Sequence, residues 1–136
     1  MLVAFVSFIV SFVIFSGFDA IWLYSMSGIY KRLIGELLGE PFQVAPALAF
    51  YVLYVCGIVG FAVLPSLSNG GWVAAAGKGA FLGIVAYGTY DLTNQATLKH
   101  WPWRLTLIDM TWGTLLTSIT AALATALVSH IYSQSS

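Results

Sequence analysis

The chain has 136 residues, of which 60% are hydrophobic and 7% are charged, and its mean hydropathy is +0.90. Soluble domains carry about 25% charged residues, so this composition is typical of an integral membrane protein. The formal net charge is zero, which argues against a nucleic-acid partner and against long-range electrostatic steering.

The first apolar segment, residues 2–24, is long enough to cross a bilayer core, which takes about 20 residues of helix. It lacks a basic start and a clear small-residue cleavage site, so we interpret it as a retained span and not as a signal peptide. In residues 28–39, apolar and charged residues alternate at helical spacing. This pattern predicts a short amphipathic helix in the headgroup layer, with a solvated linker as the alternative.

Three further apolar segments predict three more spans, over residues 44–64, 74–98 and 105–130. Pro46 fits the first turn of the second span, and Pro65 with the following "SLSNGG" is expected to end it. We therefore expect an all-α protein: a single domain over residues 1–136 that forms a bundle of four transmembrane helices.

The basic residues predict the orientation of the bundle. The loops after the first and third spans carry Lys31, Arg32, Lys99 and Arg104, whereas the opposite side has Lys78 and the N-terminal amine. The positive-inside rule therefore predicts that both termini lie on the non-cytoplasmic side of the membrane.

Three tryptophans near the predicted span ends are expected to anchor the bundle at the two membrane surfaces. Trp101 and Trp103 fit the aromatic belt on the cytoplasmic side, and Trp72 fits the opposite one.

Three of the five acidic residues, Asp19, Asp91 and Asp109, lie inside predicted spans one, three and four. A charged residue at bilayer depth costs at least about 2.5 to 3.5 kcal/mol on insertion scales, so each needs a partner, water or a function. All three fall in the cytoplasmic half at comparable depth, where a compact bundle can bring them together. We predict that they are the catalytic acids of an intramembrane pocket that opens towards the cytoplasm.

Aromatic and amide side chains at matching depth are expected to line this pocket and bind the ligand. The predicted ligand-binding residues are Trp22, Tyr51, Tyr54, Tyr87, Tyr90, Asn94 and Trp112. The alternative is that these polar residues only hold the helices together, as small and polar residues do in many membrane bundles.

No metal or cofactor is predicted. Zinc prefers His and Cys ligands, but His100 and His130 lie near span ends and Cys56 is the single cysteine. Haem ligation by a histidine and binding of a hard cation such as Mg²⁺ by the acids stay open as alternatives. No phosphate-binding loop, nucleophile elbow or dinucleotide fingerprint occurs.

The residues collected above also carry a family resemblance. Together, "DAIWL" from Asp19, Pro46 with Tyr51 and Tyr54, "AYGTYDLTNQATL" from Ala86, Trp101 with Pro102, and "DMTWG" from Asp109 resemble the DUF2177 family of predicted bacterial membrane proteins. The resemblance covers nearly the whole chain. It implies a multi-pass protein of the bacterial inner membrane and carries no particular activity.

Two classes of function remain, with a third behind them. The first is binding or acid/base processing of a lipid or other hydrophobic small molecule in the pocket. The second is a small proton- or cation-coupled transporter that works as a homodimer, and the third is a structural subunit of a membrane complex. A transporter requires polar residues in the outer half, which is mostly apolar apart from Ser7, Ser11, Lys78, Thr120 and Thr125, so a closed-ended pocket is favoured.

Overall fold

The computed structural model describes residues 1–134, and every regular element in that range is helical. The elements are α1 (Leu2–Ile34), the 3₁₀ turn η1 (Gly35–Leu37), α2 (Val44–Ile58), the π turn η2 (Val59–Val63), α3 (Leu64–Ser68), α4 (Gly71–Thr97) and α5 (Trp103–Ser133). The expected all-α fold is confirmed.

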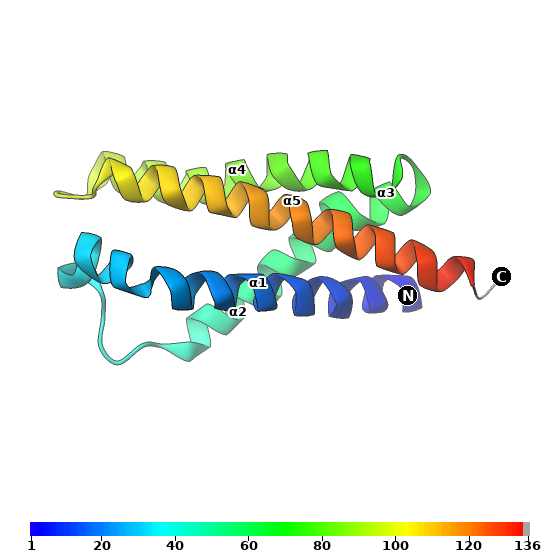
Figure 1. Ribbon diagram of the computed structural model, residues 1–136, viewed down its shortest axis with the longest axis horizontal. Coiled ribbons are helices and arrows are strands. Elements are labelled where there is room, and N and C mark those ends of the chain that lie inside the picture. Colours follow the sequence, from blue (N-terminus) through cyan, green and yellow to red (C-terminus); the bar gives the residue numbers. More distant parts are fainter. Residues whose placement is uncertain (135–136) are drawn as a thin grey trace.

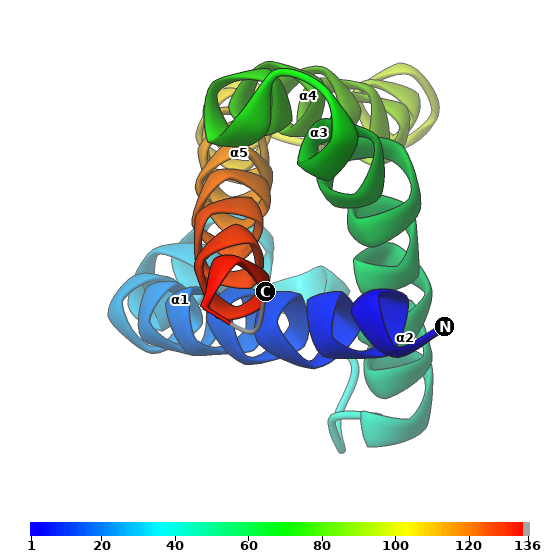
Figure 2. The same cartoon turned by 90° about the vertical axis from the view of Figure 1, so that its right-hand side faces the viewer.

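Four long helical segments run back and forth along the molecule. α2, η2 and α3 form one continuous helix, so the passes are α1, α2 to α3, α4 and α5. Both termini lie at one end, and the α1–α2 and α4–α5 connections lie at the other (Figure 1). Seen from the terminal end, the helices cross one another and do not run strictly parallel (Figure 2).

Three of these segments are long and apolar enough to cross a membrane: Leu2–Leu37, Val44–Ser68 and Trp103–Ser133. α4 has 27 residues, which at a rise of about 1.5 Å per residue is long enough to cross a bilayer core. It carries Lys78 and Asp91 and is rich in small residues, so it is less apolar than its neighbours.

Helix α1 is longer than the sequence pattern predicted. The segment expected as a separate interfacial helix, residues 28–39, continues α1 without a break to Ile34 and ends in η1. Gly28 is tolerated within the helix, and there is no proline to interrupt it. Lys31 and Arg32 occupy the last turn, where positive charge is favourable beside the carboxyl end of the helix dipole.

The second span ends at Ser68, within the expected "SLSNGG" stretch, but Pro65 itself does not end it. Proline lacks the N–H that would bond one turn back, and the helix widens into the π turn η2 just before it. Helix α3 then begins with Pro65 in its first turn, where that N–H is not needed. The segment ends one turn later, where Gly70 and Gly71 adopt positive φ angles of 91° and 58°.

α4 and α5 form the tightest pair of helices in the bundle. A methyl group placed on Gly79 would lie 2.7 Å from the carbonyl oxygen of Thr117, and one on Gly83 would lie 2.6 Å from that of Gly113. The two backbones therefore touch, which only small residues permit at helix interfaces in membranes. Ser118 adds a hydrogen bond of 2.9 Å across the interface, from its Oγ to the carbonyl oxygen of Ala76.

The distribution of side chains suits a lipid environment. Hydroxyl residues such as Ser11, Thr117 and Thr120 are fully buried, whereas large apolar residues such as Phe61 and Phe81 are mostly exposed. In lipid, apolar side chains need no burial and polar groups are placed between helices.

The three expected membrane anchors behave differently. Trp72 and Trp103 are 59% and 62% exposed, as an aromatic belt requires. Trp101 is only 7% exposed, and its Nε1 donates to Oγ1 of Thr106 at 3.0 Å. The expectation for Trp101 was therefore wrong, because this ring packs into the end of the α4–α5 pair and faces neither lipid nor water.

Candidate functional site

The centre of the site is a pair of carboxyl groups, Asp91 on α4 and Asp109 on α5. Asp91 is fully buried, and no N–H or hydroxyl group of the described residues donates to its carboxyl oxygens, which lie against the carboxyl group of Asp109. The two carboxyl groups are close enough to interact directly, and no basic residue of the part described forms an ion pair with either. Tyr30 donates from its hydroxyl to Oδ1 of Asp109 at 3.1 Å.

Burying these two carboxyl groups side by side is unfavourable in free energy unless a proton, water or a ligand compensates. A buried carboxylate without a cation or hydrogen-bond donor has lost its hydration and gained nothing in exchange. A neighbouring carboxyl group adds repulsion if both are ionised. The pair is stabilised by a proton shared between the two acids, by water, or by a ligand that donates to them.

A cavity of about 330 Å³ adjoins the pair and offers space for such a ligand. It is lined by Phe50, Ala86, Tyr87, Tyr90 and Asp109. Its walls are apolar and aromatic apart from the single carboxylate, which is the usual composition of a small-molecule site. Phe50 and Tyr90 are 46% and 57% exposed, so the cavity opens sideways towards the surrounding lipid.

Asp19 on α1 has a different environment. Tyr51 donates to its Oδ2, and the Nε1 of Trp112 donates to its Oδ1 at 3.1 Å. Both oxygens are therefore satisfied, although the residue is only 8% exposed. Within residues 1–134 no three His, Cys, Asp or Glu side chains come close enough together to hold a metal ion. The three acids lie in one region of the bundle, but they are not one set of metal ligands.

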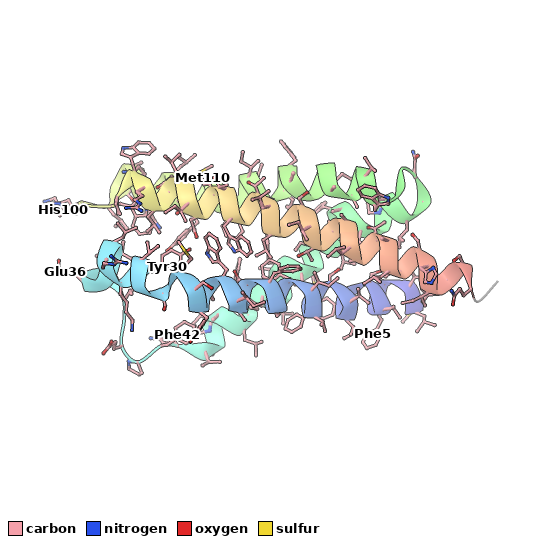
Figure 3. All side chains as sticks on the ribbon, viewed as in Figure 1. Phe5, Tyr30, Glu36, Phe42, His100 and Met110 are labelled. Carbon is pink, nitrogen blue, oxygen red and sulfur yellow. The ribbon has the colours of Figure 1, made fainter. Side chains whose placement is uncertain are left out.

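A chain of aromatic contacts connects Asp19 with Asp109. Trp112 stacks on Trp22, with ring centroids 4.3 Å apart and planes 3° from parallel. The Nε1 of Trp22 donates to the hydroxyl of Tyr30 at 2.9 Å, and Tyr30 in turn donates to Asp109. Tyr30 lies on α1 and faces the α4–α5 pair (Figure 3), so its hydrogen bond joins α1 to α5 at Asp109.

Two tyrosines of the second and third passes complete the wall. Tyr54 shares a hydrogen bond of 2.7 Å with Thr117, and its ring meets that of Tyr87 edge to face at 6.0 Å. Tyr87 lies flat against Gly113, where an added methyl group would come within 2.1 Å of the ring. The absence of a side chain at Gly113 therefore sets the position of Tyr87.

Most of the predicted site residues lie around this region. Asn94 is half-buried one turn from Asp91 and interacts with Tyr90 at the rim. Gln95, which shares the helical face of Asp91 in the sequence, instead donates to the carbonyl oxygen of Trp101 at 2.9 Å and so ties down the α4–α5 turn.

The sequence patterns missed Tyr30 and Phe50. Tyr30 had been assigned to a separate interfacial helix, so its contact with Asp109 was not foreseen. Asp19, Trp22, Met26 and Tyr30 follow helical spacing, and a continuous α1 would have placed Tyr30 on the same face as Asp19. Phe50 has no signal in the sequence that separates it from the other apolar residues of α2.

Comparison with known proteins gives one match. The model of the family DUF2177, described as a predicted membrane protein, matches residues 4–126. The chain belongs to this family. The matched range contains every residue of the site described above. No match was found among curated proteins or among solved structures. Family membership thus supports a membrane protein with apolar helical spans, and the chemistry has to be argued from the site itself.

Proposed function

We propose that this protein binds a lipid or other hydrophobic small molecule in the cavity beside Asp91 and Asp109 and that the two carboxyl groups act on it as an acid/base pair. The observation that carries the proposal is the fully buried Asp91 carboxyl group, which receives no hydrogen bond from an N–H or hydroxyl group and lies against a second carboxyl group, that of Asp109. Carboxylates inside membranes are rare and usually mark substrate or proton pathways, because they are expensive to maintain for packing alone.

The shape of the cavity supports a ligand that arrives from the bilayer. Its walls are aromatic and apolar, and the exposed faces of Phe50 and Tyr90 border on lipid. A water-soluble substrate would lose its hydration on entering and would gain one carboxylate in return. A hydrophobic molecule with one hydrogen-bond donor fits this combination.

The two acids would divide the work. Asp109 lines the cavity and can touch the ligand, whereas Asp91 lies beside Asp109 and exchanges a proton with it. When the pair holds one proton, one member can act as a general acid and the other as a general base. Tyr87 and Tyr90 would hold the ligand against Asp109, and Tyr30 would fix the carboxyl group by its hydrogen bond.

The substitution Asp91→Asn tests the proposal, because it removes the charge and keeps the volume. The variant is expected to fold at least as well as the wild type, since an unpaired buried charge is lost, and to lose the hydrophobic molecule that co-purifies with the protein. Mass spectrometry of the bound molecules gives the readout, and Glu40→Gln, at an exposed residue outside the helices, is the matched control. Identical bound molecules in the wild type and in a folded Asp91→Asn protein would contradict the proposal.

A second candidate, proton-coupled transport, is favoured by one observation. Five buried hydroxyl groups on α1 and α5 have no hydrogen-bond partner in the described part of the chain: Ser7, Ser11, Ser16, Thr120 and Thr125. Unpartnered hydroxyls are suited to hold water, which would extend the polar region towards the terminal end. Proton uptake into vesicles that contain the protein, abolished by Ser11→Ala and Thr120→Val, would support transport. If vesicles that contain the wild-type protein take up no protons, a binding site without transport would be favoured.

A further inference from the structure

A second pocket, separate from the cavity at Asp109, lies at the end of the molecule opposite the termini. It has a volume of about 540 Å³ and is formed where the last turns of α1 and η1 meet the turn between α4 and α5. Its polar lining consists of Lys31, Arg32, Glu36, Lys99 and His100. Glu36 and His100 are visible together at this end in Figure 3.

The pocket carries more positive charge than its single carboxylate can neutralise. Three of the five Lys and Arg residues of the chain line it, against the single carboxylate of Glu36. No ion pair joins Glu36 to any of the three cations in the range that the structure covers. Cations that converge in this way repel one another, and an anion bound between them would remove that repulsion.

The backbone and side chains of the pocket are held in place. Arg32 donates from Nε to the carbonyl oxygen of Gly28 at 3.3 Å, which leaves the end of the guanidinium group free to bind. His100 has a φ of 64°, the one positive value at a non-glycine residue in the described chain. Positive φ angles are uncommon outside glycine, although histidine adopts them more readily than most residues, and non-glycine residues in this conformation cluster at binding sites. The neighbouring Trp101 is buried and donates a hydrogen bond to Thr106, and these contacts hold the turn between α4 and α5 in this conformation.

We propose that this pocket binds the phosphate of an anionic phospholipid headgroup. The pocket lies at the end of the helices, where they leave the bilayer, and Leu33, Ile34 and Leu37 provide an apolar side for the glycerol and acyl portion. Phosphate is recognised by Arg and Lys through charge-assisted hydrogen bonds. The positive-inside rule assigns this end to the cytoplasm, which identifies the inner leaflet as the source of the lipid.

Native mass spectrometry of the purified protein with added lipid tests this proposal. We expect phosphatidylglycerol to bind more tightly than phosphatidylcholine. Arg32→Gln and Lys99→Gln should each weaken phosphatidylglycerol binding about tenfold, because each removes a charge-assisted hydrogen bond to the phosphate that contributes about 1.5 kcal/mol. The matched control is Arg104→Gln, which lies at the same end of the bundle but does not line the pocket.

The possible results separate cleanly. An equal loss in Arg104→Gln and Lys99→Gln would show general surface attraction and would overturn the pocket. Equal binding of the two lipids would overturn the anionic headgroup, and displacement of the lipid by inorganic phosphate at equimolar concentration would overturn the lipid as the preferred source. The proposal for the acid pair depends on the molecule that co-purifies with Asp91→Asn, and this one depends on added phosphatidylglycerol in Lys99→Gln, so the two can fail independently.

Discussion

Two carboxylates of this bundle are buried in opposite ways. Asp19 accepts hydrogen bonds from Tyr51 and Trp112, and both of its oxygens are occupied by the protein itself. Asp91 is equally inaccessible but receives no hydrogen bond from an N–H or hydroxyl group, and its neighbour is another acid, Asp109. A satisfied carboxylate fixes helices relative to one another, whereas an unsatisfied one is available to a proton or a ligand. In the proposed function, Asp19 would therefore act mainly in positioning, and the Asp91–Asp109 pair would carry the chemistry.

Gly113 provides a prediction at the same scale. In Gly113→Ala the new methyl group would lie 2.1 Å from Cγ of Tyr87, so the ring must move and the cavity wall with it. We expect a loss of about 1 to 3 kcal/mol in stability, as for other overpacked sites, together with weaker retention of the bound molecule. Thermal unfolding in detergent and mass spectrometry of the bound molecules measure the two effects.

The control for this substitution is Gly57→Ala. No atom lies within 4 Å of a methyl group added at Gly57, so this variant should keep both properties. Wild-type stability and ligand retention in Gly113→Ala would show that the position of Tyr87 does not depend on Gly113.

At the scale of elements, the α4–α5 pair positions most residues of the site. Asp91, Tyr87 and Tyr90 lie on α4, Asp109 lies on α5, and the spacing between the two helices decides whether the acids meet. That spacing depends on Gly79 and Gly83, because a methyl group added at either position would lie within 3 Å of the backbone of α5.

The variant Gly83→Ala should separate the two helices. Its methyl group would lie 2.6 Å from the Gly113 carbonyl oxygen and 2.9 Å from Cα of Thr114, and backbone atoms cannot move aside as a flexible side chain can. We expect a destabilisation of about 1 to 3 kcal/mol, measured by thermal unfolding. Gly77→Ala, on the same helix with nothing within 4 Å, should be neutral or slightly stabilising. Equal melting temperatures for the two variants would contradict the close approach of α4 and α5.

The sequence predicted the helices better than their ends. Apolar runs separated by Gly, Pro and charged turns were enough to place the four passes, because a bilayer core requires runs of this length. Pro65 was misjudged because a π turn can absorb the missing N–H, and the register of hydrogen bonds in that turn leaves no trace in hydropathy. The extension of α1 to Ile34 was missed because charged residues at a helix end resemble an interfacial segment.

The same difference holds for the site. The depth of Asp19, Asp91 and Asp109 follows from counting residues along each helix. This count predicts that the three acids lie in one region of the bundle. Pairing is a tertiary property, so no count could show that Asp91 meets Asp109 or that Tyr51 and Trp112 satisfy Asp19. Trp101 illustrates this limit. Its position beside a span end predicts a membrane anchor, but the structure buries it in the protein.

At the scale of the whole molecule, the positions of the termini determine how many times the chain crosses the membrane. The N- and C-terminal ends lie at the same end of the bundle (Figure 1), which requires an even number of crossings. Three helices qualify by length and apolar composition, so the fourth crossing must be α4 in spite of Lys78 and Asp91. Lys78 donates to Oγ of Ser66 at 3.3 Å near the terminal end, where a long basic side chain can reach the surface.

Cysteine labelling tests this count in intact cells. In a Cys56→Ala background, we expect a membrane-impermeant maleimide to label Asn69→Cys and Gln134→Cys from outside and to leave Glu36→Cys and His100→Cys unlabelled until the cells are opened. The positive-inside rule fixes the direction, because the basic residues gather at the end that holds Glu36 and His100. The opposite pattern would keep the four crossings and invert the protein, which would place the basic pocket in the outer leaflet. Labelling of Asn69→Cys and His100→Cys from the same side would show that α4 does not cross, and the Asp91–Asp109 pair would then lie outside the membrane core.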